Sequence, residues 1–235
     1  MVVHRGNRRY PTTYGELANL AGRFAAELDR RGVGRDERVV LWGENSAEWI
    51  GVFFGCLLRG VIAVPLDAAG SSEFAARVIA DVTPRLIVGD ADLLADLPEG
   101  APGSGAGVGP AARLTFSRLR DELPAEPLFA VSDAVNQQTA FQIVFTSGTT
   151  SGPRGIVHTH RNILVTLQPI ENEIAKYRKY ERWVHPLRFL HSLPLSHVFG
   201  QFMGLWIPAV LAAEVHFAEQ LDPGRISELI RRERI

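Results

Sequence analysis

Short apolar segments alternate with longer helix-type segments along most of this chain, and this alternation restricts its fold more than any other feature. Residues 13–31 place apolar side chains on one helical face, and Gly32 follows them. Residues 39–42 and 61–64 are apolar runs of strand length, and residues 46–59 between them have helix length. Because strands that are separated by helices usually pair in parallel, the pattern predicts an α/β fold with layered, predominantly parallel sheets and flanking helices.

The same alternation continues to the end of the sequence. It predicts helices at 72–82, 91–97, 115–123, 161–180, 200–211 and 223–234, and strands at 86–88, 188–193 and 214–217. A run of Gly, Pro, Ala and Ser at residues 98–110 interrupts every periodicity. Its glycines do not fit G-x-G-x-x-G and no strand immediately precedes them, so we interpret the run as a flexible linker and not as a nucleotide loop.

One segment is unusually rich in groups that bind phosphate. Residues 145–155 contain five hydroxyl side chains, three glycines and one arginine. Glycines allow backbone N–H groups to approach an anion, hydroxyls add donors, and a guanidinium matches phosphate oxygens. The candidate phosphate-binding residues are Thr146, Ser147, Gly148, Thr149, Thr150, Ser151, Gly152, Arg154 and Gly155.

This phosphate loop fits neither a Walker A pattern nor a dinucleotide fingerprint. Apolar residues precede it, and strand-type residues 156–160 follow it, so we expect it to join two strands. The alternative is a surface hairpin whose Ser, Thr and Gly residues bind nothing.

The loop resembles the signature T-S-G-T-T-G-x-P-K-G of the AMP-forming adenylating enzymes, which include acyl-CoA synthetases, peptide-synthetase adenylation domains and beetle luciferases. Ser151 and Gly152 stand in exchanged order relative to that signature, and Arg154 replaces its lysine. Arginine keeps the charge and adds a bidentate fork. Four further segments resemble family motifs in the same order, at residues 34–49, 53–66, 159–162 and 193–200, whereas residues 90–135 resemble nothing specific.

The resemblance implies two half-reactions. A carboxylate attacks the α-phosphate of MgATP to give an acyl-adenylate and pyrophosphate, and a thiol such as coenzyme A then displaces AMP. The phosphate loop would hold the pyrophosphate oxygens, and His197, in Leu-Pro-Leu-Ser-His-Val-Phe-Gly, would help to orient the carboxylate. A hydrogen-bonded core histidine is the alternative for His197. We assign no metal ligand to this chain.

The resemblance also implies two α/β subdomains and a substrate class. One subdomain would combine residues 1–71 with 185–235, and the other would span residues 72–184 and carry the loop. The motif around His197 and the apolar segment after it look most like medium-chain and long-chain fatty acyl-CoA synthetases. Met203, Leu205 and Trp206 would line an acyl tunnel or fill a core, and aryl acids and amino acids remain alternative substrates.

At 235 residues the chain is shorter than members of this family. The family motifs for adenine and magnesium, for ribose, and for the catalytic lysine are not found, so the sequence is interpreted as an N-terminal piece that is inactive alone. Its unfinished sheet would favour self-association into a homo-oligomer or poor solubility. A phosphate-binding module without turnover and an interaction protein derived from a synthetase are the alternatives.

Composition and charge exclude several other functions. A net charge of -1 gives no basic excess for nucleic acid. No apolar stretch reaches the roughly 20 residues that a membrane span requires, and no signal peptide is found. Cys56 lies in an apolar run, which indicates a buried side chain, and a single cysteine fits a reducing, cytoplasmic location. His158 and His160 have a spacing that suits a metal on a strand, but no further ligand lies near them in the sequence.

Overall fold

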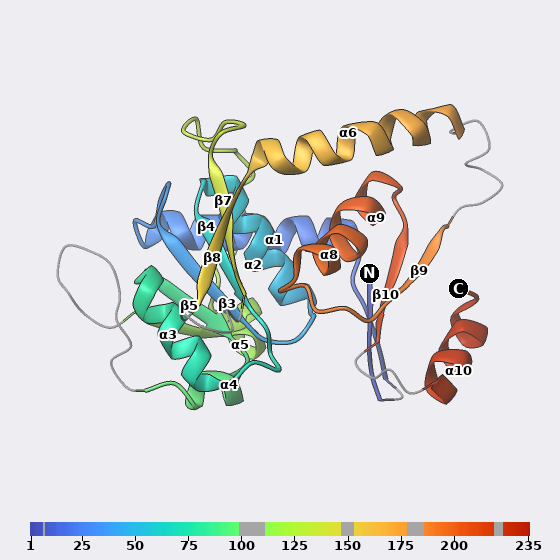
Figure 1. The fold of residues 1–235 in the computed structure, drawn as a ribbon, viewed down its shortest axis with the longest axis horizontal. Helices are drawn as coiled ribbons and strands as arrows, with labels where there is room; N and C mark the ends of the chain where they lie inside the picture. Colours follow the sequence, from blue (N-terminus) through green and yellow to red (C-terminus); the bar gives the residue numbers. More distant parts are fainter. Residues whose placement is uncertain (7, 99–110, 147–152, 178–185, 219–222) are drawn as a thin grey trace. The chain divides into compact units, whose positions relative to one another are not determined.

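The computed structural model describes residues 1–6, 8–98, 111–146, 153–177, 186–218 and 223–235. The chain divides into two compact units. The continuous unit comprises residues 15–160, and the split unit combines residues 1–14 with 161–235. Each unit is built on one sheet, and the two sheets have six and four strands among the described residues (Figure 1).

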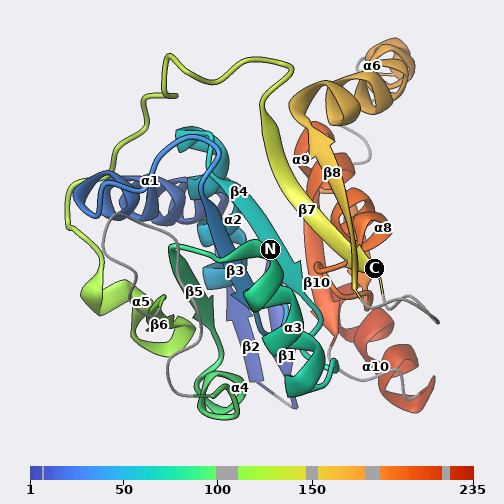
Figure 2. The same ribbon diagram turned by 60° about the vertical axis from the view of Figure 1, so that its left-hand side comes forward.

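The six-stranded sheet belongs to the continuous unit and has the order β6-β5-β3-β4-β7-β8 (Figure 2). All neighbours pair in parallel except β7 and β8, which are antiparallel. The strands are β3 (Arg38–Trp42), β4 (Ile62–Leu66), β5 (Leu86–Gly89), β6 (Ala112–Thr115), β7 (Ala140–Thr146) and β8 (Arg154–Thr159). The parallel α/β arrangement that the alternating pattern predicts is therefore confirmed.

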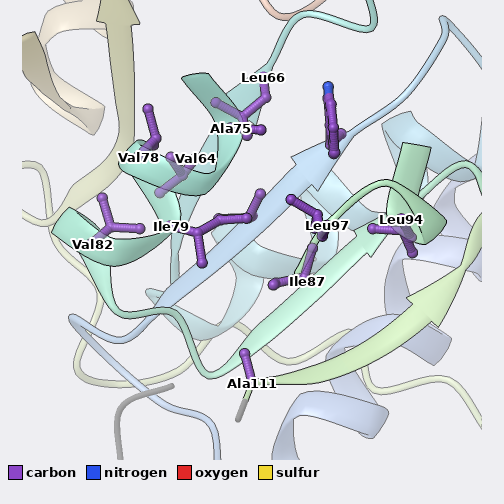
Figure 3. Packing of buried hydrophobic residues seen from close by; sticks show 12 residues of the cluster. Val64, Leu66, Ala75, Val78, Ile79, Val82, Ile87, Leu94, Leu97 and Ala111 are labelled. Atoms are coloured by element: carbon purple, nitrogen blue, oxygen red, sulfur yellow. The ribbon is translucent and has the colours of Figure 1, made fainter. Parts of the chain in front are cut away.

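Helices flank this sheet, and one of them covers a dense apolar cluster. The helices are α1 (Tyr14–Arg30), α2 (Ala47–Arg59), α3 (Ser72–Val82), α4 (Ala91–Ala95) and α5 (Phe116–Glu122). The cluster brings α3 and the α4 region against one face of strands β3 to β5 (Figure 3). Its members are Val40, Trp42, Val64, Leu66, Ala75, Val78, Ile79, Val82, Ile87, Leu94, Leu97 and Ala111.

Helix α2 packs closely against α1 because it presents glycines to that helix. A Cβ atom at Gly51 would lie 2.5 Å from Leu20 Cγ, and one at Gly55 would lie 2.8 Å from the carbonyl oxygen of Ala21. The hydroxyl of Ser46 caps α2 by accepting a 3.0 Å hydrogen bond from Trp49 N. Helix α2 therefore has a fixed start and a close partner.

The split unit carries the four-stranded sheet, in the order β2-β1-β10-β9. Its strands are β1 (Val2–Arg5), β2 (Arg8–Pro11), β9 (Arg188–His191) and β10 (Glu214–Ala218). Strand β1 pairs in parallel with β10 and antiparallel with β2, and β10 pairs in parallel with β9. The helices between residues 160 and 235 are α6 (His160–Tyr177), α8 (Val198–Gln201), the π-helix η2 (Phe202–Trp206), α9 (Ile207–Val210) and α10 (Pro223–Glu233).

The strand pairing groups the chain differently from the expected subdomains. Strands β3 and β4 were expected in a layer with residues 185–235, but they pair with β5 and β7 of the continuous unit. Only the first strands of the chain join β9 and β10. The connection through α2 places β3 and β4 side by side, and the chain then returns through α3 to add β5 on the other side of β3.

Two further observations complete the comparison with the sequence. The linker proposed at residues 98–110 lies, apart from Pro98, outside the described residues. Within the described part of the chain, no helix is both long enough and apolar enough to cross a lipid bilayer.

Candidate functional site

The phosphate loop connects two antiparallel strands, as the sequence predicts. Thr146 at the end of β7 lies opposite Arg154 at the start of β8, and both residues are exposed. Of the candidate phosphate-binding residues, the structure brings together these two and Gly155. Six others lie outside the described residues: Ser147, Gly148, Thr149, Thr150, Ser151 and Gly152.

The orientation of β7 determines at which edge of the sheet the loop lies. Strand β7 pairs in parallel with β4, so its carboxyl end points the same way as those of β3, β4 and β5. Ligands of open α/β sheets bind beyond the carboxyl ends of the strands. The hairpin therefore carries Thr146 and Arg154 to the edge where a ligand is expected.

Two acidic side chains at this edge stabilise backbone turns. Asp67 Oδ1 accepts a 3.0 Å hydrogen bond from Ala69 N, and Asp90 Oδ2 accepts a 2.8 Å hydrogen bond from Glu44 N. The first contact is a local one of the kind that Asp commonly makes in loops, and the second joins the segments that follow β3 and β5. Arg154 supplies a positive charge and a planar donor group at the same edge, which suits an anionic ligand.

The base of the hairpin is fixed by close packing. A Cβ atom at Gly155 would lie 2.8 Å from Ile143 Cγ2 and 2.9 Å from Phe145 Cζ, so glycine is required where β8 leaves the loop. Gln142 is fully buried, and its Nε2 lies 2.9 Å from Nδ1 of His158 on the opposite strand. The sequence analysis missed Gln142, although a polar residue inside an apolar run was a signal for it.

His158 and His160 both pack against Phe141. The ring centroid of Phe141 lies 6.5 Å from that of His158 and 5.4 Å from that of His160. Burial lowers the pKa of both histidines, which favours neutral rings. Among the described residues no third Asp, Glu, His or Cys side chain joins them in a metal-type group. Ring packing and the contact with Gln142 account for His158, whereas His160 packs on Phe141 and its buried Nε2 has no hydrogen-bond partner among the described residues.

His197 lies in the split unit, where the chain leaves β9 and enters a helix. It occupies the N-cap of α8 with an extended backbone, and it is exposed. The sequence predicted this position between a strand and a helix, and the exposure contradicts the alternative of a buried core histidine. His197 belongs to the split unit, and the hairpin belongs to the continuous unit.

The turn before His197 is held by two residues of the following helix. A Cβ atom at Gly200 would lie 2.0 Å from the carbonyl oxygen of Pro194, so only glycine allows this approach. Gln201 is fully buried, and its Nε2 donates a 3.0 Å hydrogen bond to the carbonyl oxygen of Leu195. Both contacts fix the backbone that presents His197.

Comparison with known proteins places these features in a family. The family model described as AMP-binding enzyme matches residues 2–235. A linear gramicidin synthase of Brevibacillus parabrevis is 31% identical over 219 residues, which are 93% of this chain and 3% of that protein. The long-chain-fatty-acid–AMP ligase FadD23 of Mycobacterium tuberculosis is 29% identical over 94% of this chain and 38% of its own length. The long-chain-fatty-acid–CoA ligase FadD13 of the same species is 28% identical over 95% of this chain and 43% of its own length.

Solved structures share the fold. The N-terminal domain of FACL13 from Mycobacterium tuberculosis superposes with a TM-score of 0.74 at 21% identity, covering 100% of this chain and 56% of the other. An o-succinylbenzoate CoA synthetase from Bacillus subtilis, in complex with its acyl-adenylate intermediate, gives 0.74 at 18% identity with the same coverage. The chain thus spans about half of these solved chains and less than half of the curated relatives named above.

The family model covers nearly the whole chain, and the relatives and solved structures agree with it. Together with the hairpin at the carboxyl edge of a parallel sheet, these matches show that the chain belongs to the AMP-binding enzyme family, the AMP-forming adenylating enzymes.

Proposed function

We propose that this chain is the N-terminal part of an ATP-dependent, AMP-forming acid–thiol ligase, and that its phosphate loop holds the triphosphate of ATP. The observation that carries the proposal is the hairpin, in which Thr146 and Arg154 lie opposite each other beyond the carboxyl ends of parallel strands. A hydroxyl and a guanidinium are the donors that phosphate oxygens require. Family membership supplies the reaction class.

The proposed chemistry has two steps. A carboxylate oxygen attacks the α-phosphorus of ATP, the bond from that phosphorus to the bridging oxygen of the β-phosphate breaks, and pyrophosphate leaves. A thiol, proposed to be that of coenzyme A, then attacks the acyl carbon and expels AMP. The departing pyrophosphate gains negative charge in the first step, so Arg154 and the loop hydroxyls act by positioning and electrostatic stabilisation. Magnesium would accompany the ATP phosphates.

His197 is the proposed orienting group for the carboxylate. Its place at a helix start beyond the carboxyl end of β9, and its exposure, support this role. The close approach of Gly200 to Pro194 and the hydrogen bond from Gln201 to Leu195 hold the backbone of the turn, and the imidazole of His197 remains at the surface. No side chain of this chain need act as a covalent nucleophile, because the substrate carboxylate performs the attack.

A fatty acid is the proposed acid. Two relatives, FadD23 and FadD13, are described as long-chain-fatty-acid ligases, and they match this chain over 94% and 95% of its length. Gramicidin synthase also matches, at a similar identity, so an amino acid is the competing substrate class. Formation of a radiolabelled acyl-adenylate by the full-length ligase, from labelled palmitate or from labelled amino acids, distinguishes the two classes.

Calorimetric titration with ATP and pyrophosphate tests the phosphate-binding role. We expect Arg154→Ala to weaken binding of both ligands by about tenfold or more, because it removes a charge-assisted contact. Arg154→Lys keeps the charge and should retain most of the affinity. Equal affinity in the wild type and Arg154→Ala would contradict the assignment.

Arg118→Ala is the matched control for this titration. Arg118 lies in α5 of the same unit, its side chain is 74% exposed, and it pairs with Glu122 within its own helix. The Arg118→Ala substitution removes one positive charge from the unit, as Arg154→Ala does, but it leaves the hairpin unchanged. A loss of affinity in this variant equal to that of Arg154→Ala would mean that general charge, and not the loop, attracts the ligand.

A further inference from the structure

A buried polar cluster in the split unit takes no part in the proposed reaction. His4 on β1 and His216 on β10 are 5% and 1% exposed, and their rings stack with centroids 5.3 Å apart. Helix α10 covers them with Arg232 and Glu233 of its last turn. Histidines are seldom so deeply buried without a role for their hydrogen bonds.

The hydrogen bonds define which nitrogen of each ring carries a proton. Arg232 Nη2, which is always a donor, lies 3.2 Å from His4 Nδ1, so this nitrogen accepts. His4 Nε2 then carries the proton and donates across 3.0 Å to His216 Nδ1. His216 Nε2 carries the last proton; Glu214 Oε1 lies 3.4 Å away, and this nitrogen has no hydrogen-bond partner among the described residues. Both rings are therefore neutral and each has a single tautomer.

Charged groups from every neighbouring element surround the pair. Arg9 of β2 lies 3.1 Å from Glu214 and 3.2 Å from Glu233. Arg188 of β9 lies 3.4 Å from Glu214, and Arg232 lies 3.1 Å from Glu233. Three arginines thus oppose two glutamates around the rings. A proton added to His4 would enter at Nδ1, directly against the guanidinium of Arg232.

The same cluster does not suit a metal ion. His4, His216 and Glu233 offer ligand atoms within 4.8 Å of one another. Coordination through His4 Nε2 would require the proton to move to Nδ1, where Arg232 already donates. The three arginines would also repel a divalent cation. The geometry favours a hydrogen-bonded pair.

Polar contacts attach the last turn of α10 to the sheet. Leu229 is its only buried residue among those described. Three contacts join this part of the chain to strands β2, β1 and β9: Arg9 with Glu233, Arg232 with His4, and Arg188 Nη1 with the carbonyl oxygen of Arg234, just after the helix, at 3.4 Å. An attachment made of charged and hydrogen-bonded groups depends on whether the rings of His4 and His216 are protonated.

We propose that the His4–His216 pair is a pH-sensitive latch, which holds α10 on the four-stranded sheet while both rings are neutral and releases it when they are protonated. Burial is the largest influence on both rings, and it lowers the pKa of each below its ordinary value; Arg9 and Arg232 add to this at His4, whereas Glu214 and Glu233 oppose it. A released pair would regain an ordinary pKa near 6.5. Protons therefore bind the released state first. The latch is closed above about pH 6.5 and opens as the pH falls below that value.

Amide hydrogen exchange read by mass spectrometry tests the latch in the unmodified chain. After correction for intrinsic exchange, peptides from residues 223–235 should exchange about tenfold faster at about pH 5.5 than at about pH 7.5. Peptides from β1 and β10 should keep their protection, because the sheet itself does not open. An α10 exchange rate that does not change with pH, or simultaneous loss of protection in the strands, would overturn the proposal.

Two variants assign the effect to the pair. His4→Gln keeps an N–H near the position of Nε2 but cannot titrate, so α10 should lose the part of its pH dependence that His4 contributes and keep the part that His216 contributes. His191→Gln is the control, because His191 is a buried histidine of the same sheet whose pKa burial also lowers. It should leave the response of α10 unchanged. Full wild-type pH dependence in His4→Gln would refute the latch.

Nitrogen-15 spectra of the histidine rings in the wild type provide a test that needs no variant. We expect His4 and His216 to be Nε2–H tautomers at about pH 7.5 and to become charged only below about pH 6.5. A zinc titration at the higher pH completes the test. Zinc-induced shifts confined to these two rings would overturn the proposal in favour of a metal site.

Discussion

Gly200 is the residue at which the backbone of the candidate site has least room. Alanine there would place its Cβ 2.0 Å from the carbonyl oxygen of Pro194, so the turn that presents His197 must move. We expect Gly200→Ala to lower the stability of the split unit by about 1–3 kcal/mol, measured by urea unfolding. Gly34→Ala is the control, because nothing lies within 4 Å of a Cβ at Gly34. Equal losses of stability in the two variants would contradict the close approach of Gly200 to Pro194.

Cys56 gives a second prediction for a single residue. It is 0% exposed in α2, and burial raises the pKa of its thiol far above the ordinary value. The reactive thiolate is therefore nearly absent in the folded chain. Iodoacetamide should modify Cys56 at about pH 8 only after urea is added. Rapid labelling of the folded protein would show that the thiol is accessible.

The sequence predicted the backbone positions of Thr146, Arg154 and His197, but it did not predict the residues that support them. Thr146, Arg154 and His197 follow motifs, and the structure places them where a strand ends, where a strand begins and where a helix begins. Gln142 and Gln201 were missed because their function is to hold neighbouring backbone or side chains. Such contacts become visible only when the partner's position is known.

At the scale of elements, strand β8 forms an exposed edge of the six-stranded sheet in the described part of the chain. Ile156 and Val157 on this strand are 50% and 55% exposed. An apolar edge strand can pair with a second copy, so we expect concentration-dependent self-association. Val157→Lys should suppress it in sedimentation experiments. The control is Val131→Lys, because Val131 is 56% exposed but lies outside any strand. A wild type that stays monomeric at high concentration would refute this expectation.

Periodicity predicted most elements, but it missed the strands whose side chains are polar. Strand β2 reads Arg-Arg-Tyr-Pro and is exposed throughout, so neither apolar alternation nor burial marks it. Its partner β1 contains His4 and Arg5, and it becomes a strand by pairing with β10. Strand β10, with which β1 pairs, lies more than two hundred positions away in the sequence.

At the scale of the whole molecule, buried histidines make stability depend on pH. Burial lowers the pKa of His158, His160 and His191, as well as those of the latch pair. The unfolded chain therefore takes up protons first as the pH falls below about 6.5, and stability declines. We expect a lower urea midpoint at about pH 5.5 than at about pH 7.5, with Glu27 contributing only at more acidic pH. An unchanged midpoint would contradict the burial of these rings.

The grouping of segments into units is the property that the sequence predicted least well. Local patterns gave the right class of fold, yet the assignment of residues 15–71 to a layer with the last strands was wrong, because their strands join β5 and β7. The order of strands in a sheet depends on which faces bury each other, and not on the pattern within one strand.

The pairing of β1 with β10 has a consequence for synthesis on the ribosome. The continuous unit is one uninterrupted stretch of chain and can fold as soon as residue 160 has emerged. The first strand must wait for β10, because His4 and His216 are 212 positions apart. At about 5–20 residues per second this delay lasts tens of seconds or less, and during it β1 is exposed to chaperones and to other nascent chains. Strand β1 therefore becomes native later than the strands of the continuous unit, although it precedes them in the sequence.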